Sequence, residues 1–95
     1  MSLLLVVDRL ASDDLDTTFV WYESQNVGLG NRFLSRIHDV FALIARMPEA
    51  YAVLRRGTRA APVKKFPYVV LYRVETTQIR VIRVVHGRSN RKNWP

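Results

Sequence analysis

The first part of the chain changes from a continuous apolar run to a helical repeat. Residues 3–7 are all apolar, which indicates a short strand covered on both faces. Apolar side chains then recur every three or four positions, and acidic ones favour the first turns, as the helix dipole prefers. Asp8, with Ser12 as the alternative, can cap this helix by accepting a backbone N–H bond. The apolar face of the helix is predicted to consist of Ala11, Leu15, Thr18, Phe19 and Tyr22.

A second helical repeat follows a break that contains glycine. Residues 25–31 read QNVGLGN, in which Gly28 and Gly30 permit positive φ and therefore a tight connection. The second helix is expected to stop near Arg46, because Pro48 cannot continue it. Two helices joined by so short a linker are expected to pack as an antiparallel hairpin. The apolar positions of the second repeat are Phe33, Ile37, Val40, Phe41 and Ile44.

After Pro48 the pattern is that of strands. Three are predicted, over residues 59–65, 68–74 and 79–86, with a bend at 66–67 and a turn at 76–78. Pro62 argues for an edge or irregular strand. The predicted order is β-αα-βββ, an α+β fold with a helical hairpin packed on a small, mainly antiparallel sheet. Residues 1–95 are expected to form one domain.

Basic side chains are concentrated in the second half of the chain. The formal net charge of the whole chain is +7. Residues 1–48 carry a net charge of about −2 and residues 49–95 about +9, counted from the sequence. This asymmetry predicts an acidic partner: nucleic acid, an acidic protein or an anionic membrane. No apolar run is long enough to cross a bilayer, so a soluble protein without a membrane role is expected. The lack of cysteine excludes disulfides and agrees with a cytoplasmic location.

Motifs for metal or cofactor chemistry are missing. The two histidines, His38 and His86, are far apart, and no zinc-binding spacing occurs. The GLG of residues 28–30 lacks the other parts of a phosphate-binding loop. No metal and no cofactor is therefore expected.

The basic side chains near the last strands are the main candidates for binding. If they converge on one face of the sheet they can neutralise phosphates, with Tyr68, Tyr72 or Trp94 stacking on bases; otherwise they form a solvated face. His86, at a strand end, is either a neutral base or a side chain that donates to a backbone carbonyl. The basic candidates are Arg55, Arg56, Arg59, Lys64, Lys65, Arg80, Arg83, Arg88, Arg91 and Lys92.

Short motifs follow one another in a specific order between Asp8 and Trp94. They are Ala11-x-x-Asp14-Leu15, Trp21-Tyr22-Glu23, Gly28-Leu29-Gly30-x-Arg32-Phe33-Leu34, Pro48, Arg59, Phe66-Pro67-Tyr68-x-x-x-Tyr72-Arg73 and His86-Gly87-Arg88. The ordered set resembles the RelE/ParE toxin superfamily. Members are toxins of type II toxin–antitoxin modules, often described as plasmid stabilisation proteins, and have the β-αα-βββ fold. The resemblance therefore implies a bacterial, cytoplasmic inhibitor of growth.

The resemblance also implies a partner, the cognate antitoxin, whose flexible C-terminal segment covers the toxin and with which oligomers are possible. The basic half of the chain suits an acidic segment that folds on binding. Trp21 and Tyr22 are expected to be core residues or antitoxin contacts.

The superfamily divides by target, and two readings follow. In the RelE-like branch, a metal-independent endoribonuclease cleaves messenger RNA in the ribosome; Arg59 and Lys65 would hold phosphate, His86 would move a proton, and Arg88 would match a C-terminal arginine. Several nucleases have arginine where this chain has Val69, which argues against a complete site.

The ParE-like branch poisons DNA gyrase by binding it, and the segments WYE, GLGxRFL, YRVE and HGR look closer to this branch. A degenerate, non-toxic member is the third possibility. Under the ParE-like reading the binding residues, for target or antitoxin, are Arg83, His86, Arg88, Arg91, Lys92 and Trp94, with Tyr68, Tyr72, Trp21 and Tyr22.

Overall fold

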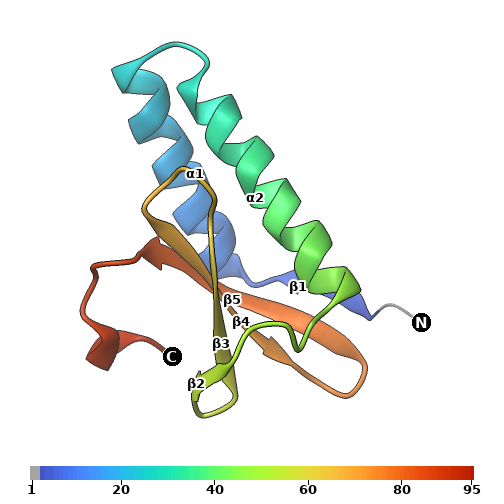
Figure 1. The fold of residues 1–95 in the computed structure, drawn as a ribbon. Helices are drawn as coiled ribbons and strands as arrows, with labels where there is room; N and C mark the ends of the chain where they lie inside the picture. The colour runs from blue at the N-terminus through green and yellow to red at the C-terminus, as the bar shows by residue number, and fades with distance from the viewer. Residues whose placement is uncertain (1–2) are drawn as a thin grey trace.

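Two helices lie antiparallel over one face of a five-stranded sheet (Figure 1). The computed structural model describes residues 3–95. The elements are β1 (Leu4–Val7), α1 (Arg9–Gln25), α2 (Leu29–Arg46), β2 (Val53–Arg55), β3 (Thr58–Pro62), β4 (Tyr68–Val74), β5 (Gln78–His86) and a 3₁₀ turn (Arg91–Asn93).

The strand order in the sheet is β1-β5-β4-β3-β2. β1 runs parallel to β5, and every other neighbouring pair is antiparallel. This arrangement confirms the α+β fold, the helical hairpin and the mainly antiparallel sheet. In the described residues no helix is both long and apolar enough to cross a membrane.

The connection between the helices depends on two glycines in different ways. Gly28 has φ of 91° and precedes α2, as expected for a tight turn. Gly30 is instead helical, and a Cβ there would lie 2.7 Å from ring carbons of Phe19. Glu23 closes the turn, because its carboxylate accepts the backbone N–H groups of Gly28 and Gly30, each at 3.0 Å. The first turn of α2 is thus capped by a side chain from α1.

The main core lies between the helices and the sheet. Phe33, Ile37 and Ile44 of α2 are buried against Tyr72 and Ile79 of the sheet. Burying each such large apolar side chain contributes roughly 1.5–3 kcal/mol. An aromatic cluster extends this core, with ring centroids 5.0–6.2 Å apart, and consists of Tyr22, Phe33, Phe66 and Tyr68.

The C-terminal tail lies over the opposite face of the sheet. Leu71 is fully buried although, by strand alternation, it points away from the helix-facing Val70 and Tyr72. Trp94 is only 7% exposed and lines a small cavity with Thr58 of β3. The sheet is therefore covered on both faces at its centre.

Two details of the strands differ from the sequence-based expectation. β2 was not predicted, because it is three residues long and exposed and so carries no alternating pattern. β3 ends at Pro62, so Lys64 and Lys65 lie in the connection to β4 rather than in a strand. β2 pairs only with Thr58 and Arg59 of β3. Pro62 lies beyond these pairs, so its lack of a backbone N–H removes no hydrogen bond to β2.

Candidate functional site

His86 borders an open cavity of about 440 Å³ between α1 and the ends of β4 and β5. Tyr68 and His86 are direct cross-strand partners, with ring centroids 5.4 Å apart. On α1, Trp21 is 56% exposed whereas Tyr22 is buried. Burial and the neighbouring Tyr68 raise the pKa of Tyr22. The cavity is lined by Thr17, Thr18, Trp21, Tyr22, Pro67, Tyr68 and His86.

The ring of His86 is oriented by the backbone that follows it. Its Nδ1 accepts the backbone N–H of Arg88 at 3.0 Å, so in this arrangement the ring proton is on Nε2. The sequence-based alternative, a histidine that donates to a carbonyl, does not describe this contact. Ser89 fixes the same turn, donating its backbone N–H at 2.9 Å and its hydroxyl at 2.6 Å to the carbonyl of His86.

The residues expected for a nuclease are not brought together. Arg59 pairs across the sheet with Tyr72, whereas His86 pairs with Tyr68. Tyr72 and Tyr68 are four residues apart along β4, a distance of about 13 Å. Arg59 also donates a hydrogen bond to the carbonyl of Tyr51 at 2.5 Å.

The other two nuclease candidates are exposed in different places. Arg88 follows β5 beside His86, while Lys65 borders a different cavity, next to α2. Val69 pairs with Val85 and points to the face opposite Tyr68 and His86. His86, Arg88 and Tyr68 are therefore neighbours, without Arg59, Lys65 or Val69.

Three of the predicted target or antitoxin contact residues, Arg83, Tyr72 and Trp94, form hydrogen bonds within the molecule. Arg83 donates to both carboxylate oxygens of Asp14, at 2.7 and 2.9 Å, and these bonds raise the pKa of its guanidinium. Tyr72 is fully buried, and its hydroxyl donates to the carbonyl of Pro48 at 2.8 Å. Trp94 is buried, and its indole N–H donates to Ser89 Oγ at 2.8 Å.

The tail presents two further cations. Arg91 and Lys92 are exposed in the 3₁₀ turn. Asn90 caps the start of this turn, because its side-chain oxygen accepts the backbone N–H of Lys92 at 3.0 Å. The guanidinium of Arg91 lies 5.3 Å from the centre of the Trp94 ring, within cation–π range. Trp94 therefore positions the tail.

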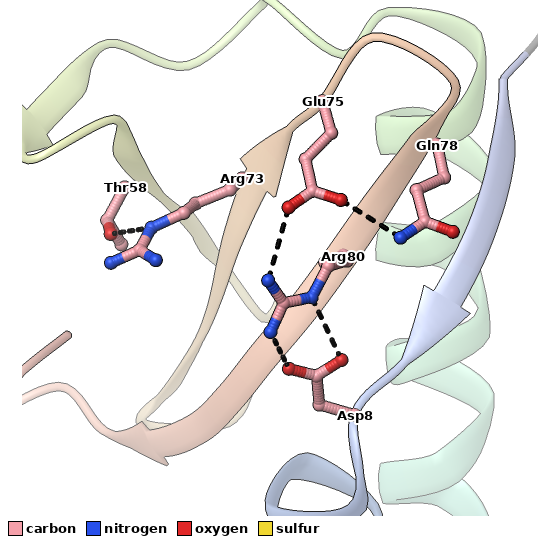
Figure 2. A network of polar contacts seen from close by, with 6 residues as sticks. All are labelled: Asp8, Thr58, Arg73, Glu75, Gln78 and Arg80. Atoms are coloured by element: carbon pink, nitrogen blue, oxygen red, sulfur yellow. Dashed lines mark hydrogen bonds and ion pairs between the residues drawn. The ribbon is translucent and has the colours of Figure 1, made fainter.

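Acidic residues of the N-terminal half neutralise part of the basic sheet, which sequence analysis missed. Figure 2 shows Arg80 between Asp8 and Glu75, with donor–acceptor distances of 3.2 and 2.5 Å to Asp8 and 3.1 Å to Glu75. Bonds from Gln78 and Arg80 lower the pKa of Glu75. Asp8 begins α1 but makes no capping hydrogen bond with its side chain, because the carboxylate binds Arg80.

The described residues include no group of three or more histidine, cysteine or acidic side chains that could hold a metal ion. The chemistry available at the His86 cavity is thus one of aromatic surfaces, one oriented imidazole and nearby cations.

Comparison with known proteins gives consistent results. A family model described as the ParE toxin of the type II toxin–antitoxin system parDE matches residues 5–91. Toxin ParE3 of Caulobacter vibrioides is 34% identical over 86 residues, which cover 86% of this chain and 84% of the relative.

Two solved structures are also similar. The chromosomal ParDE toxin–antitoxin system from P. aeruginosa has a TM-score of 0.68 at 18% identity, with 90% of this chain and 96% of that chain covered. The toxin–antitoxin complex RelBE2 from Mycobacterium tuberculosis has a TM-score of 0.67 at 25% identity, with 90% and 99% covered. At 18% identity the first likeness concerns the fold alone.

Proposed function

The chain belongs to the ParE toxin family of type II toxin–antitoxin systems, and from this premise we propose that it arrests bacterial growth by binding DNA gyrase. The observation that carries the proposal is the family match over residues 5–91, which includes both helices and all five strands except Leu4. Gyrase is the target that resemblance to the ParE-like branch implies. This target places the site of action in the bacterial cytoplasm.

The geometry around His86 supports binding over RNA cleavage. Cleavage through the 2′-OH needs a base, an acid and stabilisation of phosphate charge within one site. Arg59 is about 13 Å along the sheet from His86 and is bound to a carbonyl, and Val69 offers no charge. A surface that binds a protein needs no such assembly.

The proposed target surface consists of His86, Arg88 and the cations of the tail, Arg91 and Lys92. His86 lines the cavity that contains Trp21 and Tyr68, and Arg88 follows it in the chain, whereas Arg91 and Lys92 border a separate cavity beside Trp94. An aromatic surface beside unpaired cations is typical of protein interfaces, in which tyrosine, tryptophan and arginine are enriched.

A cognate antitoxin is the second partner that we propose. The two similar solved structures named above are described as toxin–antitoxin systems, one of them as a complex. The net charge of about +9 over residues 49–95 favours an acidic antitoxin segment.

The proposal is tested by inducing the gene in a bacterial host and pulse-labelling DNA and protein synthesis in the following minutes. DNA synthesis is expected to fall first, and the purified chain is expected to inhibit supercoiling by gyrase. An earlier fall in protein synthesis, with cleaved messenger RNA, would contradict gyrase as the target and support the nuclease. Normal growth after induction would indicate a non-toxic member.

A further inference from the structure

A small cavity lies between the tip of the β2–β3 hairpin and the C-terminal tail, which are at the same end of the molecule (Figure 1). Its volume is about 250 Å³, and it shares no residue with the His86 cavity. Arg55 of the hairpin donates to the carbonyl of Lys92 in the tail at 3.5 Å. The cavity therefore forms only when the tail folds back onto the hairpin.

The mouth of this cavity is basic. Arg55 borders it from the hairpin, and Arg91 and Lys92 border it from the tail, all three exposed. Over residues 3–95 none of the three forms an ion pair with a carboxylate, and no aspartate or glutamate lines the cavity. The mouth thus keeps a net positive charge that suits an anion of more than one negative charge.

The interior of the cavity is mainly apolar. Leu54 and Pro95 contribute carbon surface, and so does the ring of Trp94, because its single N–H already donates to Ser89. Thr58 is 1% exposed, and its hydroxyl accepts the Nε–H of Arg73 at 3.1 Å (Figure 2). An interior of this kind suits a flat ring system.

The hairpin turn fixes the position of Arg55. Arg55 pairs with Thr58, and the two residues between them, Arg56 and Gly57, have φ of 50° and 76°. Positive φ at both central residues defines a type I′ turn, which matches the twist of the flanking strands and usually has asparagine before the glycine. Arginine in the strained first position gives up local stability and brings a further cation to this end of the molecule.

We propose that the cavity binds a nucleotide, with its base against Leu54 and Trp94 and its phosphate held by the cations at the mouth. Arginine binds phosphate oxygens through two parallel hydrogen bonds, and a phosphate monoester carries a charge of about −1.5 to −2 near pH 7. The volume is just below the roughly 300–1,000 Å³ of pockets for drug-sized ligands, so one base fills it. The site goes beyond the proposed function, which needs only contacts with proteins.

Other anions match the cavity less well. Inorganic phosphate would satisfy the cations but would leave the apolar interior empty. An acidic peptide would bring carboxylates but no flat ring for the surface of Trp94. A free nucleotide and the phosphorylated end of a nucleic-acid strand present the same base and phosphate, and they are the two sources that the experiment separates.

The test follows the fluorescence of Trp94 in a Trp21→Phe background, since the chain has two tryptophans. The probes are adenosine monophosphate, adenosine and inorganic phosphate, each titrated at constant ionic strength. The site variant is Arg55→Gln with Arg91→Gln. The control, Arg9→Gln with Arg46→Gln, removes two exposed arginines that do not line this cavity. Thermal melting monitored by circular dichroism verifies that the variants are folded.

Adenosine monophosphate is expected to change the emission of Trp94 to saturation and to bind about tenfold more tightly than adenosine or phosphate alone. The site variant should bind it about tenfold more weakly, and the control within about twofold of the parent. If the double variant does not fold, Lys92→Gln alone replaces it, with an expected loss of about fivefold.

Three results overturn the proposal. They are no saturable response to adenosine monophosphate up to about 5 mM, equal affinities of site variant and control, and inorganic phosphate that binds as tightly as the nucleotide. A glutamate-rich peptide that displaces the nucleotide at equal concentration also overturns it, because the surface would then be one for acidic proteins.

A short single-stranded DNA with a 5′-phosphate separates the two sources. Tighter binding of this strand than of adenosine monophosphate, with the same loss in the site variant, supports the end of a nucleic-acid strand as the ligand. Weaker or equal binding supports the free nucleotide. All of these measurements use the purified chain alone, so their failure leaves the proposed inhibition of gyrase untouched, and a lack of toxicity leaves the nucleotide site untouched.

Discussion

Glycine is needed at position 30 because α1 lies too close for a side chain there, and not because of the backbone angle. A Cβ at this position would meet Phe19 ring carbons at 2.7 Å and the Phe19 carbonyl oxygen at 2.9 Å. Because part of that contact is backbone, the two helices would have to move apart. The expected cost of Gly30→Ala is about 1–3 kcal/mol of unfolding free energy.

Urea denaturation of the variant measures this cost. Gly87→Ala is the matched control, because a Cβ there meets its nearest atom at an ordinary 3.6 Å. A Gly30→Ala variant as stable as Gly87→Ala would show that the helices are not packed at this contact.

Tyr72 couples the sheet to the end of α2 through its hydroxyl. Removing that hydroxyl in Tyr72→Phe leaves the carbonyl of Pro48 without this donor, at a cost of about 1 kcal/mol. Burial raises the pKa of Tyr72 above its ordinary value of 10.0. The stability linked to this group is therefore fully present below pH 10 and is lost as pH rises through the folded-state pKa.

Urea midpoints between pH 8 and pH 11 test both parts of this prediction. The variant should be less stable than wild type at pH 8, and the difference should shrink as pH rises. A difference that stays constant to pH 11 would mean that Tyr72 does not titrate on unfolding.

At the scale of elements, α1 is fastened to an unpaired edge of β5. β1 pairs with β5 only as far as Val81. Beyond that point Asp14 of α1 accepts the backbone N–H of Val84 at 2.9 Å and the guanidinium of Arg83. Asp14 therefore accepts a backbone N–H of this edge, as a carbonyl of a further strand would.

Replacing Asp14 by asparagine removes the charge that pairs with half-buried Arg83. Asp14→Asn is expected to cost about 1–3 kcal/mol of unfolding free energy. The neighbouring Asp13 forms only a 4.0 Å pair with Arg9, with side chains 61% and 93% exposed. Asp13→Asn should thus leave the urea midpoint almost unchanged, and equal effects of the two changes would refute this role of Asp14.

At the scale of the whole molecule, folding divides the basic residues into paired and unpaired sets. Asp8 and Asp14, from the acidic half of the chain, neutralise Arg80 and Arg83 in the basic half. Cations outside such pairs include Arg88, Arg91 and Lys92 after β5, Lys64 and Lys65 before β4, and Arg55 and Arg56 at the β2–β3 turn.

The target surface predicts a loss of toxicity without a loss of fold. In the double variant His86→Ala with Arg88→Ala, growth arrest should require an inducer concentration at least tenfold higher, because both side chains belong to the proposed gyrase contact. The control is His38→Ala with Arg9→Ala, the same two residue types at exposed positions of the helices. Full toxicity of a folded His86/Arg88 variant would remove these residues from the site.

The sequence by itself determined the order of all elements except β2 and the C-terminal 3₁₀ turn, the ends of the helices and the family. Helical and strand periodicities, turn glycines and Pro48 act through neighbouring residues, so they can be read along the chain. It also determined His86 and Arg88 as neighbours at the end of β5.

Only the tertiary structure decided which of the candidate residues are free. Arg83 meets a carboxylate 69 positions away, and Arg80 one that is 72 positions away. Those contacts depend on the parallel pairing of β1 with β5 and on the path of α1 across the sheet edge, which no local pattern encodes. Register likewise decided that Tyr72 is buried and that Arg59 is distant from His86, because a strand places alternate residues on opposite faces and separates partners by about 3.3 Å per residue.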